Sequence, residues 1–344
     1  MKKGFVRTEI GSEFWDIPVG KPEAALLPED TRWFISGTAA LGYIIQDIQR
    51  TAAVKRVGVP SWCCSCMIQP FLDAGLTVVF YPVYPDAENR LTCDYAAVSD
   101  CDVTLVLSYF GYTRLNVTGL PGGILIRDLT HSLFCRKYDD ADYYFGSLRK
   151  WAGFWTGGYA WKNGSWLADE AVEPVDAGYL RLRKDAMERK LDYLTGAAHS
   201  KDYLDQFEAA EDFLDQCGIM GSCVRDIQCA RELDAAYLKK RRTENARILL
   251  EGLQELALFP EIQKDDCPMF VPILLPDRQT RDGLRRHLIS REIYCPVHWP
   301  ISQLHVLGEK EKVLYDRSLS IVCDQRYDEQ DMMRILEAIK AFRK

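Results

Sequence analysis

The sequence lacks the marks of several protein classes. Its 344 residues contain no uninterrupted apolar stretch of about 20 residues, which a transmembrane helix needs, and the first residues lack the apolar core of a secretory signal. Basic residues are not in excess, because 43 Lys and Arg face 50 Asp and Glu, for a formal net charge of -7. No basic stripe stands out that would bind nucleic acid. We therefore expect a cytoplasmic protein with neither a membrane nor a nucleic-acid partner.

Metal-binding patterns are also scarce. The chain has five histidines, and none lies near its one dense cysteine group, formed by Cys63, Cys64 and Cys66. Without a second pair of ligands, a zinc site is the weaker interpretation of this group. The 12 cysteines are spread over a chain too long to need disulfide staples, and a cytosolic location keeps thiols reduced. Most cysteines are therefore expected to be small buried hydrophobic residues.

The apolar residues, by contrast, follow clear patterns. From about residue 33 to residue 164, short apolar runs alternate with helical segments, as in parallel strands buried on both faces. We predict strands at Arg56–Trp62, Thr77–Val83, Val103–Phe110, Gly123–Leu129 and Tyr143–Leu148, and helices at Thr38–Thr51 and Ser65–Ala74. This alternation predicts an α/β domain with three layers.

The second half of the chain has two further patterns. Residues 177–256 are charged and helical, and alternation then returns. We predict strands at Phe270–Leu275, Ile293–Trp299 and Ser318–Cys323, and helices at Gln279–Ser290, Glu309–Asp316 and Glu329–Phe342. The predicted domains are residues 1–250, with the α/β domain and the helices that follow it, and residues 251–344, a small α+β domain. A cleft between two such domains is a common ligand site.

Two segments of the α/β domain could bind a charged ligand. Residues 36–41 read Ser-Gly-Thr-Ala-Ala-Leu and open a helix, where free backbone N–H groups hold an anion, although Ser36 could simply cap the helix. Asp128 ends an apolar strand, where open α/β sheets bind their ligands. Its carboxylate could face a protonated ring nitrogen or cap the following turn.

Two other segments could supply a nucleophile and an aromatic platform. Lys150 follows a strand and has aromatic neighbours that exclude water, and desolvation lowers the pKa of an amine and makes it nucleophilic. The alternative is a surface lysine beside Arg149. Trp62 ends a strand and could stack on a flat cofactor. Farther along, His298 and Trp299 could face the cleft or pack within the small domain.

Together these motifs resemble a known family. Ser-Gly-Thr-Ala-Ala-Leu at 36–41, Asp128 with His131 three residues later, and Ser-Leu-Arg-Lys-Trp at 147–151 before a Gly-Gly turn are similar to the DegT and StrS group of pyridoxal-phosphate-dependent aminotransferases. Pro-Val-His-Trp-Pro at 296–300 also resembles that group's C-terminal domain. The resemblance implies an α/β, three-layer large domain of fold type I with a smaller C-terminal α+β domain.

The resemblance also implies catalytic roles. Lys150 would form a Schiff base with pyridoxal 5'-phosphate and later move the substrate proton. Asp128 would pair with the pyridinium nitrogen and keep the ring an electron sink. His131 would sit beside the ring and the Asp128 carboxylate.

The remaining cofactor contacts follow from the same resemblance. The backbone of Gly37, Thr38 and Ala39, the Thr38 hydroxyl and Ser147 would hold the phosphate. Trp62 is the candidate for stacking on the ring, although a count from the preceding proline points nearer Cys64. Two departures stand out. The serine that many members carry five residues before the lysine is Phe145 here, and the loop rich in Asn, Tyr and Arg that crosses a dimer is not recognisable between residues 165 and 225.

The implied activity is transfer of an amino group, from glutamate, to a keto group of a sugar nucleotide or related small molecule, in a homodimer. One alternative is another reaction of the same cofactor, such as elimination or racemisation. The other alternative is a non-catalytic binding protein with the same fold. Related sugar dehydratases replace the lysine by histidine, and Lys150 argues against that variant.

Overall fold

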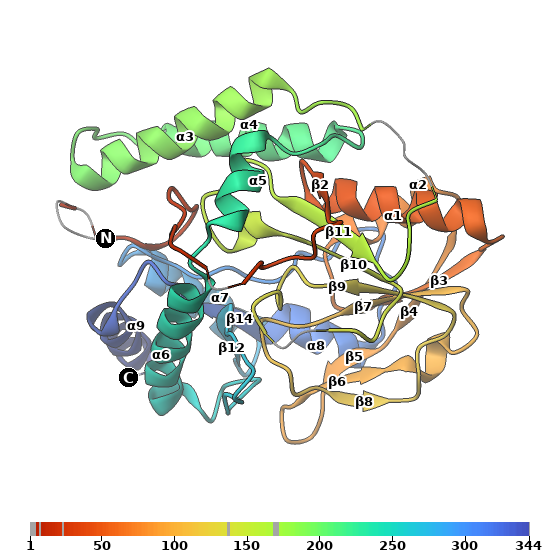
Figure 1. Ribbon diagram of the computed structural model, residues 1–344. Coiled ribbons are helices and arrows are strands. Elements are labelled where there is room, and N and C mark those ends of the chain that lie inside the picture. The colour runs from red at the N-terminus through yellow and green to blue at the C-terminus, as the bar shows by residue number, and fades with distance from the viewer. Residues whose placement is uncertain (1–4, 7, 23, 136–137, 168–171, 344) are drawn as a thin grey trace.

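The computed structural model describes residues 5–6, 8–22, 24–135, 138–167 and 172–343. At its centre, within this described part, is a seven-stranded sheet with the order β2-β11-β10-β9-β7-β3-β4 (Figure 1). The strands are β2 (Arg32–Phe34), β3 (Arg56–Pro60), β4 (Thr77–Tyr81), β7 (Val103–Leu107), β9 (Ile124–Asp128), β10 (Tyr143–Ser147) and β11 (Gly158–Lys162). From β4 to β10 neighbouring strands are parallel, and β11 runs antiparallel to β10 and β2.

Burial explains why these runs form strands. All five residues of β7 and of β10 are buried, as expected where helices cover both faces of a parallel sheet. Helix α1 (Gly37–Thr51) packs against β10 and β11 through an apolar stripe that includes Leu41, Ile44 and Ile48. Its first turn therefore lies at the end of the sheet where Asp128 and Ser147 are found.

Proline changes two predicted elements. The predicted helix Ser65–Ala74 is split into a 3-10 turn, η1 (Ser65–Met67), and a short helix, α2 (Gln69–Asp73). Pro70 has no N–H group to donate and is tolerated in a helix mainly in the first turn, so α2 begins beside it. The predicted strand Thr77–Val83 likewise ends at Tyr81. After Pro82 the chain leaves the main sheet and joins a second sheet, made of β5 (Val83–Pro85), β6 (Leu91–Asp94) and β8 (Asn116–Thr118).

The C-terminal part holds a two-stranded antiparallel sheet with helices packed around it. Its elements are α6 (Ala235–Leu253), β12 (Phe270–Leu274), α7 (Arg278–Ile289), β13 (Ile293–Tyr294), α8 (Glu309–Arg317), β14 (Ser318–Val322) and α9 (Glu329–Arg343). The predicted strand Ile293–Trp299 is wrong beyond Tyr294, because Pro296 cannot donate to a ladder and its carbonyl accepts a bond from the Ser320 N–H (3.0 Å). What remains, β13, pairs in parallel with β1 (Ile10–Gly11) from the start of the chain.

This pairing bears on the domain division. The C-terminal hydrophobic core also contains Ile10 from the N-terminal segment and Leu249 from α6, and α6 packs against α9 and β12. The boundary at residue 250 stays a prediction. The packing shows that two segments before residue 250 help to form the C-terminal core.

Among the described residues between the large sheet and α6, three helices occur. They are α3 (Ala177–Thr195), α4 (Tyr203–Gln216) and α5 (Val224–Arg231). Helices α3 and α4 pack side by side and lie along the top of the view in Figure 1. They occupy the region in which the sequence shows no recognisable cross-dimer loop.

The cysteines differ from expectation at one place. Cys64 and Cys66 are joined by a disulfide, so the expectation of reduced cysteines is wrong for this pair. Cys64 directly precedes η1 and Cys66 lies within it, and their Cα atoms are 5.3 Å apart, within the usual range for a disulfide. The ten other cysteines are free, and seven of them are buried. In the described part of the chain no group of three potential metal ligands occurs, and no helix is long and apolar enough to cross a membrane.

Candidate functional site

The predicted phosphate-binding residues meet at one end of the sheet. A Cβ atom added to Gly37 would lie 3.5 Å from the Ser147 Cβ, which places the first turn of α1 beside the end of β10. Ser36 caps the helix, since its Oγ accepts a bond from the Ala39 N–H (3.1 Å). The N–H groups of Gly37 and Thr38 precede the first intrahelical bond and remain available to an anion. Both interpretations of this segment, as a cap and as an anion site, are therefore compatible.

Asp128 is a buried carboxylate at the same end of the sheet. It ends β9, is 1% exposed, and lies opposite Phe145 of the neighbouring strand β10. Its Oδ1 accepts a bond from the Thr130 N–H (2.7 Å), yet no ion pair to a described lysine, arginine or histidine is present. Burial raises the pKa of this carboxyl to about 6, against the effect of the Thr130 bonds. A buried carboxylate without a cation is unfavourable, so the position suits a ligand that supplies one.

His131 lies one turn beyond Asp128 and is also buried. Its ring stacks near Phe110 (centroids 5.0 Å apart) and Trp299 (5.6 Å). Its Nδ1 is buried without a hydrogen-bond partner. Burial lowers the pKa of the ring well below its ordinary value, and the charges of His298 and Lys150 add to this effect. The ring is therefore neutral near pH 7 and has an unused hydrogen-bonding nitrogen.

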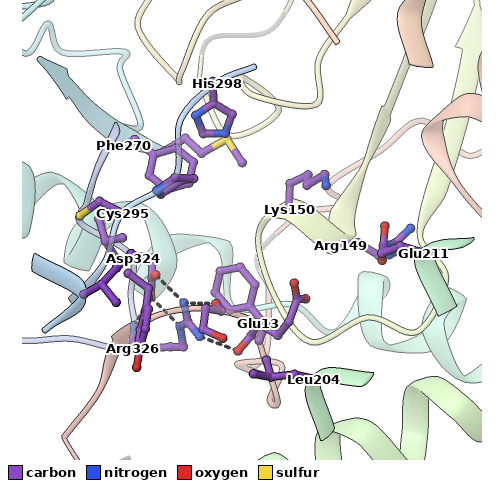
Figure 2. Close-up of a pocket in the computed structure, with 18 of the residues that line it drawn as sticks. Glu13, Arg149, Lys150, Leu204, Glu211, Phe270, Cys295, His298, Asp324 and Arg326 are labelled. Carbon is purple, nitrogen blue, oxygen red and sulfur yellow. Dashed lines mark hydrogen bonds and ion pairs between the residues drawn. The ribbon is translucent and has the colours of Figure 1, made fainter. Parts of the chain in front are cut away.

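Lys150 lies at the end of η3 (Leu148–Lys150), directly after β10, and its side chain is exposed. It lines a cavity of about 650 Å³ together with His131, Phe270 and His298. Figure 2 shows its side chain between His298 and the pair formed by Arg149 and Glu211. Burial, and then the charge of Lys150, lower the pKa of His298 to about 3. A primary amine thus faces the cavity beside two neutral imidazoles.

Not all predicted site residues reach this cavity. Lys150 and His131 line it, whereas Asp128, Ser147 and residues 37–39 are not among its described lining residues. Trp62 is 0% exposed and stacks on Tyr109 (5.1 Å between centroids). Its Nε1 donates to the His298 carbonyl (2.9 Å), so the indole is held in the core. The geometry therefore gives no support to Trp62 as the stacking residue, and the indole that lies over His131 is Trp299.

The structure adds residues that the sequence did not single out. Arg183 of α3 and Glu211 of α4 line the cavity, and Arg149, next to Lys150, joins them. One signal was available. Arg183 and Lys190 fall on the same stripe of α3 as the buried Tyr179 and Ala186, and a charge at a core-facing position often has a specific partner. The identity of that partner depends on how two helices pack and was not visible in the sequence.

The cavity carries an excess of positive charge. Its described lining includes seven basic and three acidic side chains, an excess of four. The basic residues are Arg149, Lys150, Arg183, Lys201, Arg242, Arg285 and Arg326, and the acidic ones are Glu13, Glu211 and Asp324. Asp324 and Arg326 pair with each other (2.8 Å), as the dashed lines in Figure 2 show. A small anionic molecule would be attracted to such a space.

Comparisons with known proteins bear on the fold. No protein-family model matches the chain, and no curated protein matches it. Among solved structures, PseC from Helicobacter pylori, an aminotransferase involved in the biosynthesis of pseudoaminic acid, is 16% identical with a TM-score of 0.62 and covers 96% of this chain and 99% of its own. A DegT DnrJ EryC1 StrS aminotransferase from Brucella abortus is 17% identical with a TM-score of 0.58, covering 91% of this chain and 86% of its own.

A third structure extends the set. DesI, solved in the presence of its TDP-sugar product, is 15% identical with a TM-score of 0.58 and covers 90% of this chain and 80% of its own. Identities this low establish similarity of fold, and these matches span nearly the whole chain. The predicted fold class is thereby confirmed: the chain has the α/β, fold type I architecture of pyridoxal-phosphate-dependent aminotransferases.

Proposed function

We propose that the protein is a pyridoxal-phosphate-dependent aminotransferase, which moves an amino group from glutamate to a keto group of a sugar nucleotide or related small molecule. The observation that carries the proposal is the pairing of Asp128 and Lys150. A buried carboxylate without a cation ends β9, and an amine that faces a cavity follows the adjacent strand β10. The cofactor has a positively charged ring nitrogen for the first group and an aldehyde for the second.

The other polar groups at this end of the sheet fit the same cofactor. The first turn of α1, with Ser147 beside it, offers N–H and hydroxyl donors to a phosphate. The unpartnered Nδ1 of His131 can bond a polar substituent of the ring. When bound, the cofactor supplies an electron sink for the substrate Cα. The fit therefore rests on an unpaired carboxylate, an orphaned ring nitrogen and an anion site, all present in the protein itself.

Each residue of the site would have a separate role. Lys150 would hold the cofactor through its Nζ, and the same amine would serve as the base for the proton on the substrate Cα. Asp128 keeps the ring nitrogen protonated, because a buried carboxylate strongly favours a cationic neighbour. His131, His298 and Trp299 line or overlie the same space and exclude water from it.

The solved relatives support the choice of substrate. DesI is described with its TDP-sugar product and PseC as an aminotransferase involved in the biosynthesis of pseudoaminic acid, and both match most of this chain in fold. The homodimer belongs to the proposal as well. In this chain the segment between residues 172 and 225 supplies Arg183, Lys201, Tyr203 and Glu211 to the cavity of the same subunit.

The test is retention of the cofactor. We would load the purified protein with pyridoxal 5'-phosphate, desalt it, and record visible absorbance before and after borohydride reduction. We expect a yellow band that reduction removes in the wild type and in the control Lys240→Ala, which changes an exposed lysine, but not in Lys150→Ala. Conversion to the pyridoxamine form on adding L-glutamate would then distinguish amino transfer from elimination or racemisation. A colourless wild type would overturn the proposal.

A further inference from the structure

Two buried arginines share one carboxylate beside Lys150. Arg149 forms an ion pair with Glu211, and the Arg183 Nη1 lies 3.2 Å from the same Oε1 atom. The arginine side chains are only 8% and 3% exposed, whereas the Glu211 side chain is 45% exposed. The cations are therefore fixed in the wall of the cavity, and the anion between them is the accessible partner.

The hydrogen-bond donors of this cluster are not all used. Two guanidinium groups share Glu211, and Glu13 is a second carboxylate whose charge acts on both, but the Nε atoms of Arg149 and Arg183 are buried without a hydrogen-bond partner. A guanidinium can bind a carboxylate through two parallel bonds. The cluster thus has donors to spare for the carboxylate of a ligand.

The cluster also lies close to the reacting amine. Arg149 directly precedes Lys150, and consecutive Cα atoms are about 3.8 Å apart. Burial opposes ionisation of Glu211, but the charges of Arg149, Lys150 and Arg183, in that order of strength, outweigh it and lower its pKa to about 2. Lys150 is therefore near enough to Glu211 to act on its carboxylate, and Figure 2 shows the Arg149 and Glu211 pair beside Lys150.

The position of the arginine cluster beside Lys150 indicates which kind of anionic group it binds. In an α-amino acid, one carbon separates the amino group from the carboxylate. In a nucleotide sugar, the sugar ring lies between the keto carbon and the diphosphate. An anion site beside Lys150 suits the first arrangement better than the second.

We propose that Arg149 and Arg183 bind the α-carboxylate of the amino-acid substrate, and that Glu211 occupies this position until the substrate displaces it. The proposal rests on the proposed function for the role of Lys150. It adds a substrate-binding pair from η3 and α3, and a competing carboxylate from α4. It also gives a use to the segment in which no cross-dimer loop was recognised.

The experiment measures binding of two ligands to the full chain by calorimetry, with and without added pyridoxal 5'-phosphate. L-Glutamate carries the α-carboxylate, and 4-aminobutanoate lacks it but keeps the distal one. We expect Arg183→Gln to weaken L-glutamate about 10- to 100-fold, since a bond to a charged group is lost, and to leave 4-aminobutanoate unchanged. Arg181→Gln, an exposed arginine on the same helix, is the matched control.

The competing carboxylate of Glu211 is accessible and can be replaced in a second variant. Glu211→Gln removes the competing charge and is expected to tighten L-glutamate about tenfold, whereas Glu208→Gln, exposed one turn earlier on α4, is expected to have no effect. Opposite signs for Arg183→Gln and Glu211→Gln support a binding site. If both variants lose affinity for L-glutamate, as expected for a purely structural ion pair, the proposal is wrong.

Other outcomes also decide the question. If Arg183→Gln weakens a nucleoside diphosphate and leaves L-glutamate unchanged, the pair serves the acceptor and the proposal is wrong. Cofactor uptake is recorded separately by absorbance. A chain that takes up no cofactor but still shows the opposite signs would refute the proposed function and leave the carboxylate site standing. A chain that takes up the cofactor, but in which Arg183→Gln and Glu211→Gln do not change the affinity for L-glutamate in opposite directions, would support the proposed function and refute the carboxylate site.

Discussion

Replacing Glu9 by glutamine should destabilise the protein strongly, because one buried carboxylate ties three parts of the chain together. Glu9 precedes β1, and its side chain is 1% exposed. Its oxygens lie 3.2 Å from the Lys190 Nζ of α3 and 2.8 Å from the Lys201 Nζ before α4. The Lys190 Nζ also donates to the Glu13 carbonyl (2.6 Å). The contacts of Glu9 and Lys190 therefore hold residues that form one wall of the cavity.

The magnitude follows from leaving buried ammonium groups without their counter-ion. Breaking a buried ion pair by removing one partner costs about 3 to 5 kcal/mol. An unfolding entropy of about 2.1 cal/mol/K per residue amounts to about 0.7 kcal/mol/K for the whole chain. The expected fall in Tm is then about 4 to 7 °C. Glutamine keeps the volume and one acceptor, which places the result toward the lower end.

The assay is thermal unfolding followed by circular dichroism at pH 7, with the exposed Glu29→Gln as the matched control. The pH dependence gives a second check. Burial raises the pKa of Glu9, but Lys190 and Lys201 outweigh it, so the net shift is below the ordinary value of 4.5. The stabilisation is therefore present above pH 4.5 and is lost as the pH falls further. A Tm within about 1 °C of the wild type at pH 7 would refute this reasoning.

Four further predictions concern the candidate site and the assembly of subunits. Asp128→Asn should stabilise the cofactor-free protein by about 3 kcal/mol at pH 8 and leave it nearly unchanged near pH 4. Burial raises the pKa of Asp128 to about 6, so the cost of the charged form begins above the ordinary pKa of 3.8 and is complete only above about pH 6. Denaturant titrations at both pH values measure this difference. The same variant should retain less pyridoxal phosphate, and unchanged retention would contradict the role of Asp128. Gly158→Ala should weaken cofactor retention at least tenfold, because the added Cβ would lie 2.0 Å from the Ser36 carbonyl oxygen and displace the start of α1. The control Gly218→Ala, with open space around it, should retain the cofactor as the wild type does. Equal retention in both variants would count against the anion site. Light scattering should give a mass of two 39.4 kDa chains, and a single-chain mass with full activity would rule out the required homodimer.

The sequence predicted those parts of the fold that depend on local pattern. Strands β3, β9 and β10 end within two residues of their predicted limits, because buried apolar runs stop where the chain turns. The Ile293–Trp299 prediction failed after Tyr294, where Pro296 ends the strand, and the partner of the remaining β13 is β1, close to the other end of the chain. No periodicity within a short window carries that information.

In the candidate site, too, the contacts that depend on local sequence were predictable and the long-range contacts were not. Asp128 and His131 belong to one turn, and Gly37 and Ser147 meet through ordinary packing of α1 on the sheet, so motif spacing was enough to group them. The pairing of Arg183 with Glu211 depends on the register of two helices and was not predictable. Trp62 failed for a related reason. An aromatic residue at a strand end can face either a ligand or the core, and only the neighbouring Tyr109 and His298 decide between them.

The pairing of β1 with β13 has a consequence for synthesis of the protein. Ile10 leaves the ribosome long before Ile293, its partner in the sheet. At about 5 to 20 residues per second, the N-terminal segment waits on the order of tens of seconds for that strand. During this interval the central sheet can assemble, while Gly11 and Glu13 still lack the hydrogen bonds that Tyr327 and Arg326 later make to their backbone over the cavity. Closure of the site is therefore a late event in biogenesis, and ribosome-bound chains that stop before residue 293 should contain the sheet without a finished cavity.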